Sequence, residues 1–154
     1  MLQRCRDALP DAWMDEAKRA AFRATHYCFA LPDGELLLTV DEPSPRLAAL
    51  LRDRNAPGMA VLTAFNPRGM QQSPALNDQA NARLRGSLAA HGYRVVAGLN
   101  VDPLGQWPDE ASFLVPGISR SQARELALRH DQLAFLWTDA ASATPRLIET
   151  AAPD

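Results

Sequence analysis

The sequence is poor in three features that would mark particular classes of protein. Lys18 is the only lysine among 16 basic residues, and the net charge is −2, so nothing favours binding to nucleic acid or to an anionic membrane. No apolar run approaches the ~20 residues that span a bilayer. The two cysteines form no CxxC pair, and no two of the three histidines have metal-ligand spacing. We therefore predict no partner among nucleic acids or membranes, and no metal site built from histidine or cysteine.

Catalytic and cofactor motifs are lacking as well. The chain contains no Walker loop, GxGxxG, HExxH or nucleophile elbow, which leaves the cofactor and the reaction, if any, undefined. Residues 1–10 carry three charges and lack the apolar segment of a signal peptide, so we expect a cytoplasmic location.

At 154 residues, the chain has the length of a single domain with a substantial core. We expect it to consist of an N-terminal helical segment (1–25), an α+β core (26–139) and a tail with an edge strand (140–154).

Turn and cap signals divide the first third of the chain. Apolar spacing predicts a helix over 12–24, and two strand-like runs, 26–31 and 35–40, flank a Pro-Asp-Gly turn typical of a β-hairpin. Ser44-Pro45 then has the form of a helix N-cap followed by proline at the first helical position. An N-terminal helix, a hairpin and a second helix are therefore expected before the main α+β unit.

The rest of the chain alternates strands and helices. Strands are predicted over 59–65, 93–101, 112–115, 133–137 and 146–149, and helices over 74–91 and 119–130. The order β-α-β-β-α-β is that of the ferredoxin-like, or split βαβ, unit. We predict an α+β fold in which this unit is extended by the preceding helix, hairpin and helix; an open three-layer α/β sheet is the alternative.

Two asparagines interrupt the apolar face of the helix that begins after Ser73. Asn77 and Asn81 flank an arc of leucines and alanine in the first two turns, where aliphatic side chains are expected. Buried amides are costly unless they are hydrogen-bonded. Their partner is either a bound ligand or the protein's own loops, and the sequence leaves both interpretations open.

The predicted topology gathers polar residues at one edge of the sheet. In a β-α-β-β-α-β unit, the exit of the first strand and the loop of the central hairpin lie at the same edge. If the strand 35–40 runs parallel to the strand 59–65, the segment that follows it joins them. The candidate cluster is Glu42, Asn66, Ser73, Asn77, Asn81, Trp107, Asp109 and Glu110.

Three functions are compatible with this cluster. The first is binding of a small polar ligand through Asn66, Ser73, Asn77, Asn81 and Trp107. The second is metal-assisted hydrolysis, in which Glu42, Asp109 and Glu110 hold a divalent cation that activates water. The third is interaction with a protein partner or a second copy of the chain through the edge strand near the C-terminus.

The chain resembles a bacterial family known as domain of unknown function family 3293. The residues that carry the resemblance are Glu42-Pro43-Ser44, Thr63-Ala64-Phe65-Asn66-Pro67, Ser73, Asn77, Asn81, Gly92-Tyr93, Trp107-Pro108-Asp109-Glu110 and Gly117-Ile118-Ser119. The family favours Trp-Asn-Pro where this chain has Phe65-Asn66-Pro67, and Glu-Glu-Ser where it has Glu110-Ala111-Ser112. The resemblance implies the fold unit and the motif positions; it implies no reaction, cofactor or partner.

Overall fold

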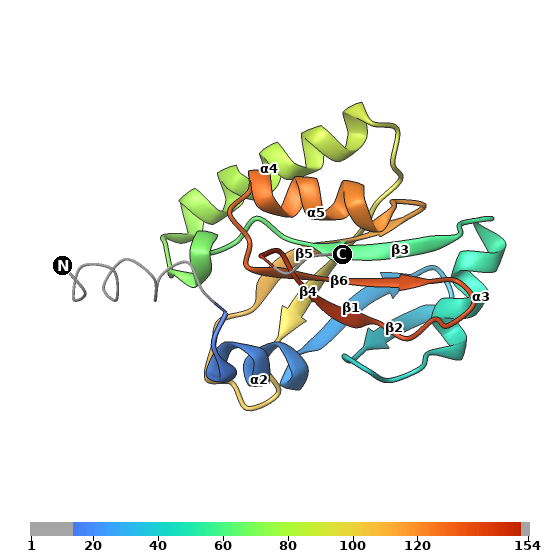
Figure 1. Ribbon diagram of the computed structural model, residues 1–154, viewed down its shortest axis with the longest axis horizontal. Helices are drawn as coiled ribbons and strands as arrows, with labels where there is room; N and C mark the ends of the chain where they lie inside the picture. Colours follow the sequence, from blue (N-terminus) through green and yellow to red (C-terminus); the bar gives the residue numbers. More distant parts are fainter. Residues whose placement is uncertain (1–13, 152–154) are drawn as a thin grey trace.

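The computed structural model describes residues 14–151, and these form an α+β fold around one curled antiparallel sheet (Figure 1). The described helices are α2 (Glu16–Ala24), α3 (Pro45–Asp53), α4 (Pro74–Ala90) and α5 (Arg120–Arg129). The strands are β1 (His26–Leu31), β2 (Gly34–Leu38), β3 (Gly58–Leu62), β4 (Val96–Val101), β5 (Glu110–Pro116), β6 (Ala134–Asp139) and β7 (Arg146–Glu149).

The seven strands lie in the order β2-β1-β4-β5-β3-β6-β7, and every neighbouring pair is antiparallel. β3 is the central buried strand of its half of the sheet, and all five of its residues are buried. Its side chains alternate between two cores: Ala60 and Leu62 face the first, and Met59 and Val61 face the second. This double burial explains the continuous apolar run in the sequence.

Helices cover the two faces of the sheet unequally. The first core packs α4 and α5 against β3, β5 and β6, and these two helices lie together above the sheet in Figure 1. The second core joins the β1–β2 hairpin, α3 and the opposite face of the central strands. The short helix α2 has no buried residue and lies at one edge of the sheet.

The predicted helix starts are confirmed where a serine caps the helix. Ser44, Ser73 and Ser119 each accept a hydrogen bond from the backbone N–H three residues on, and Ser119 forms the full capping box with Gln122. α2 begins at Glu16, later than predicted, because Asp15 caps it by accepting from the N–H of Lys18. The part of the predicted helix at residues 12 and 13 lies outside the described residues.

Strand boundaries differ more from the prediction. β3 ends at Leu62 rather than at residue 65, because the N–H groups of Ala64 and Asn66 bond to side chains of α4 and that of Phe65 bonds to the Thr63 hydroxyl, instead of to a neighbouring strand. β4 begins only at Val96, and β5 begins two residues early, at Glu110, which pairs with Asn100. The edge strand β7 has the predicted bounds.

Candidate functional site

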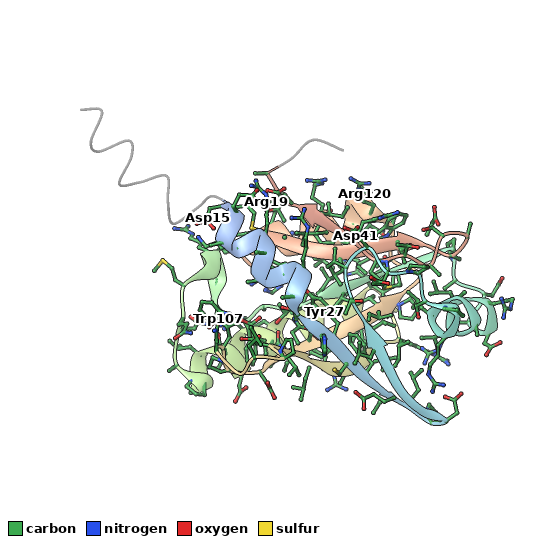
Figure 2. All side chains as sticks on the ribbon, turned by 90° about the horizontal axis from the view of Figure 1, so that it is seen from below. Asp15, Arg19, Tyr27, Asp41, Trp107 and Arg120 are labelled. Atoms are coloured by element: carbon green, nitrogen blue, oxygen red, sulfur yellow. The ribbon has the colours of Figure 1, made fainter. Side chains whose placement is uncertain are left out.

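A cavity of about 260 Å³ lies at the edge of the sheet where β3 ends and β5 begins. Its walls come from α2, the start of β1, the loop after β3, the β4–β5 hairpin loop and the segment before β6. The lining residues are Ala17, Lys18, Ala21, Phe22, Thr25, Tyr27, Phe65, Asn66, Gly69, Gln71, Asn100, Asp102, Trp107, Pro108, Glu110, Gln132 and Leu133. Figure 2 shows α2 running across this side of the molecule, with Tyr27 beyond its C-terminal end and Trp107 beside it.

The loop after β3 turns sharply at Asn66. This residue adopts left-handed backbone angles (φ 48°, ψ 64°), which asparagine tolerates better than most residues, and Arg68 and Gly69 also have positive φ. The Asn66 Oδ1 atom accepts from the backbone N–H of Gln72 at 3.2 Å, which closes the loop on itself. The turn directs the Asn66 amide nitrogen toward β5.

Asn77 holds this turn in place. Its Oδ1 accepts from the Asn66 N–H at 2.9 Å and from Gln72 Nε2 at 2.8 Å, and its Nδ2 donates to Asn66 Oδ1 at 2.9 Å. The side chain is buried, with 6% of its surface exposed. Every polar atom of the Asn77 amide is therefore bonded to the loop after β3.

Asn81 plays the corresponding role one turn further along α4. Its Oδ1 accepts from the N–H of Ala64 at 2.8 Å, and its Nδ2 donates to the carbonyl oxygen of Ala111 at 2.9 Å. Ser73 caps α4. Asn77, Asn81 and Ser73 do not line the cavity, so their side chains fix the loop that forms one of its walls.

Glu110 lies on the wall of the cavity at the first position of β5. Its Oε1 accepts from Asn66 Nδ2 at 2.9 Å, so the strained turn and the carboxylate form one unit. Burial raises the pKa of Glu110, and the hydrogen bond from Asn66 opposes part of this rise because it stabilises the ionised form. The site therefore contains a carboxyl group that holds its proton to a higher pH than an exposed glutamate does.

Three residues stand side by side across β1, β4 and β5. Tyr27 pairs with Asn100, and Asn100 pairs with Glu110. The Tyr27 hydroxyl donates to the carbonyl oxygen of Phe22 at 3.1 Å, and its pKa is raised by burial and by the nearby Glu110 charge. The Oδ1 atom of Asn100 is buried and has no hydrogen-bond partner among the described residues.

Sequence reasoning missed Tyr27 and Asn100 as residues of the site. A signal for Asn100 was present, because strand alternation from Val96 places position 100 on the same side as Val96 and Gly98. An amide at such a position needs a partner as much as those of Asn77 and Asn81 do. Tyr27 carried no comparable signal, since a buried tyrosine in a strand is common.

The acidic residues of the predicted cluster are not brought together. Asp109 is exposed and does not line the cavity. Glu42 lies elsewhere, as the contacts of its neighbour Asp41 show. The N–H of Asp41 donates to the carbonyl oxygen of Pro145, and the Asp41 carboxylate accepts from Arg146 at the start of β7. Figure 2 shows Asp41 and Trp107 on opposite sides of α2.

The prediction that Glu42 joins this edge is therefore wrong. β2 does run parallel to β3, but the curl of the sheet carries its exit toward the beginning of β7. Within residues 14–151, no group of three or more His, Cys, Asp or Glu side chains is arranged to hold a metal ion.

Trp107 is part of the cavity wall but remains 55% exposed. It follows a turn in which the carboxylate of Asp102 accepts from the N–H groups of Leu104 and Gln106 at 3.0 and 2.8 Å. The indole thus stands at the mouth of the cavity on a loop with its own internal hydrogen bonds.

Residues 62–135 match the family model described as Protein of unknown function (DUF3293). This region belongs to the DUF3293 family. It contains the Asn66–Asn77 pair, Asn81, Asn100 and Glu110, whereas α2 and Tyr27 lie outside the DUF3293 match. No curated protein and no solved structure matches the chain. None of the helices between residues 14 and 151 has both the length and the apolar character that crossing a membrane requires.

Proposed function

We propose that this protein binds a small polar molecule in the cavity between α2 and the loops that follow β3 and β4. The observation that carries the proposal is the cavity itself, which has the half-buried Asn66–Glu110 pair on its wall and Trp107 at its mouth. Ligand sites are typically concave, mostly apolar and equipped with a few convergent polar groups. Asn66 and Trp107 would touch the ligand, while Ser73, Asn77 and Asn81 would hold the wall in position.

The strand arrangement supports this location for a site. β3, β4, β5 and β6 lie in the order β4-β5-β3-β6, and α4 and α5 pack on one face of these strands. We infer that these elements form the ferredoxin-like unit that the sequence predicts. The exit of β3 and the β4–β5 loop then meet at one edge, as the Asn66–Glu110 hydrogen bond requires.

The two alternative functions gain less support. Hydrolysis by a cation held on Glu42, Asp109 and Glu110 would need these three side chains to converge, and they lie apart. Docking through β7 would rely on the main-chain groups of this edge strand and on its outward side chains. Leu147 packs against the second core, Ile148 belongs to the first, and Glu149 already bonds to Arg19 and Arg124. The cytoplasmic location, the bacterial origin and a protein partner remain predictions from the sequence.

A thermal-shift panel tests the proposed function. The protein is melted with nucleotides, sugars, phosphorylated metabolites and divalent metal ions; a ligand at ~100 times its dissociation constant adds about 2.7 kcal/mol to the free energy of unfolding. We expect at least one organic compound to raise the melting temperature without added metal. A shift produced only by metal ions would favour the hydrolase instead.

A pair of variants ties such a shift to the cavity. Ala21→Phe fills the space beneath α2, whereas Ala20→Phe places the same ring on an exposed position of the same helix that does not line the cavity. The stabilising compound should lose its effect on Ala21→Phe and keep it on Ala20→Phe. Equal responses of the two variants would move the binding site away from this cavity and contradict the proposal.

A further inference from the structure

Three hydrogen-bond donors of the cavity lining are already engaged by the protein. Asn66 Nδ2 donates to Glu110, the Tyr27 hydroxyl donates to Phe22, and Gln132 Nε2 donates to the carbonyl oxygens of Phe65 and His130. The capacity of these three side chains to donate to a ligand is therefore small.

Side-chain oxygen atoms on β4 and β5, in contrast, have few hydrogen-bond donors from the protein. Only Oε1 of Glu110 accepts a hydrogen bond from the described residues, and Asn100 Oδ1 accepts none. These two side chains stand at paired positions of neighbouring strands and both line the cavity. Glu110 offers the more open of these acceptors, since Asn100 Oδ1 has almost no accessible surface. A ligand that complements Glu110 must bring N–H or O–H groups, because an unpaired acceptor that becomes buried is costly.

The charge and the aromatic rings of the lining favour a positive group. The ionisable carboxyl groups of the lining are Asp102 and Glu110, and the one basic side chain is Lys18. Phe22, Phe65 and Trp107 bring aromatic rings to the lining, and cations are attracted to the faces of such rings. A planar cation with several N–H donors can donate hydrogen bonds to the carboxylate and also stack on an aromatic ring.

We infer that the cavity recognises a small molecule through a planar nitrogen cation of the amidinium or guanidinium class, which donates to Glu110 and lies against the ring of Trp107. This inference rests on the proposed function and names the class of ligand for the same site. The planar group pairs with a carboxylate through two parallel N–H donors, a geometry that a single ammonium does not offer.

The ionisation of Glu110 should make the affinity for such a cation depend on pH. The other titratable groups that line the cavity are Lys18 from α2, Tyr27 from β1 and Asp102 from the hairpin loop, and Tyr27 is close enough for the Glu110 charge to raise its pKa. A cation binds the ionised carboxylate, so its affinity should rise with pH as Glu110 loses its proton and then level off. A ligand that accepts from the protonated carboxyl would show the opposite slope.

Three probes of one size test the inference: benzamidine as the cation, benzamide as its neutral analogue and benzoate as the anion. Each is titrated to millimolar concentration while the amide spectrum of the protein is recorded, including the indole N–H of Trp107. We expect benzamidine to shift the signals of Trp107 and Glu110 with an affinity about tenfold or more above that of benzamide. Benzoate should leave these signals unchanged.

Two neighbouring acids provide matched variants. Glu110→Gln removes the charge within the cavity, and Asp109→Asn removes the adjacent exposed charge that does not line it. Benzamidine affinity should fall about tenfold in Glu110→Gln, with loss of the pH dependence, and stay within about twofold in Asp109→Asn. The amide spectrum of each free variant shows whether the fold is kept.

The outcomes separate the inference from the proposed function. If benzamide or benzoate binds in the cavity as tightly as benzamidine does, the cavity binds small molecules but the cationic class is wrong. If Glu110→Gln folds and binds benzamidine like the unaltered protein, Glu110 does not recognise the cation and the inference fails. If none of the three probes shifts a signal of the cavity, the proposed function itself is contradicted for ligands of this size.

Discussion

Asn66 Nδ2 donates to Glu110 Oε1 at 2.9 Å, and this bond joins a left-handed turn to the first residue of β5. Since Asn77 bonds both the backbone and the side chain of Asn66, three elements meet at this one amide. The orientation of the Glu110 carboxyl in the cavity thus depends on α4, although no residue of α4 lines the cavity. The packing of α4 and the shape of the cavity wall are therefore coupled through Asn66.

The buried carboxyl of Glu110 should make the stability of the protein depend on pH. Its pKa is raised in the folded state, so the folded protein holds this proton more tightly than the unfolded chain does. The resulting contribution to the free energy of unfolding is fully present below the ordinary glutamate pKa of about 4.3 and is lost as pH rises through the raised value. We expect Glu110→Gln to remove this component, seen as a flatter profile of unfolding free energy against pH in urea titrations. Asp109→Asn is the control, and a Glu110→Gln profile parallel to that of the unaltered protein would contradict the prediction.

Removing the Asn77 amide should loosen the loop after β3. Asn77→Ala leaves the Asn66 N–H without its acceptor, and an unsatisfied buried donor costs about 1–3 kcal/mol. Urea denaturation measures this loss. Gln79→Ala removes an exposed amide from the same helix and should change the free energy of unfolding by less than about 0.5 kcal/mol. Equal effects of the two substitutions would mean that the Asn77 hydrogen bonds add nothing to stability.

Local signals in the sequence predicted the parts of this architecture that depend on local physics. Ser44, Ser73 and Ser119 cap their helices because a hydroxyl needs only the N–H three residues away. The neighbourhood of Asn66 and Glu110 followed from the order of the strands, and the structure places their side chains in contact. Between the two interpretations of Asn77 and Asn81, the hydrogen bonds favour fixation of the protein's own loops.

What the sequence did not predict depends on contacts between distant segments. The position of Glu42 follows from the curl of the whole sheet, which strand order alone does not define. The place of α2 over the cavity follows from docking of Arg19 on Glu149, 130 residues away. Periodicity within α2 predicts a helix but does not say which surface it covers.

The contact between Arg19 and Glu149 should control how firmly α2 covers the cavity. The guanidinium donates through Nε and Nη2 to the two carboxylate oxygens of Glu149 at 3.2 and 2.8 Å, and α2 has no buried residue. We expect Arg19→Ala to speed amide hydrogen exchange across α2 while exchange in β3 stays unchanged. Arg23→Ala, in the exposed last turn of the same helix, is the control. Unchanged exchange in α2 would show that other contacts hold it.

Two glycines should respond to the same substitution in opposite directions. A Cβ added at Gly98 would lie 2.3 Å from both the carbonyl oxygen of Cys28 and the Cδ1 of Phe29, closer than real Cβ contacts. Gly98 pairs with Phe29 across β4 and β1, so an added methyl group must move the ring or separate the strands. Gly86 lies in the exposed middle of α4, and a Cβ there meets nothing within 4 Å.

We expect Gly98→Ala to lower the free energy of unfolding by about 3 kcal/mol or more. The Phe29 ring that the new methyl group would touch is 99% buried, and the other close atom, the carbonyl oxygen of Cys28, belongs to the backbone. Gly86→Ala should raise the free energy of unfolding by about 0.5–1 kcal/mol, because alanine loses less conformational entropy in a helix. Urea denaturation measures both changes. Since β4 also carries Asn100, the separation of β1 and β4 in Gly98→Ala should weaken binding in the cavity beyond the loss of folded protein. A Gly98→Ala protein as stable as Gly86→Ala would show that the two strands can move apart at little cost.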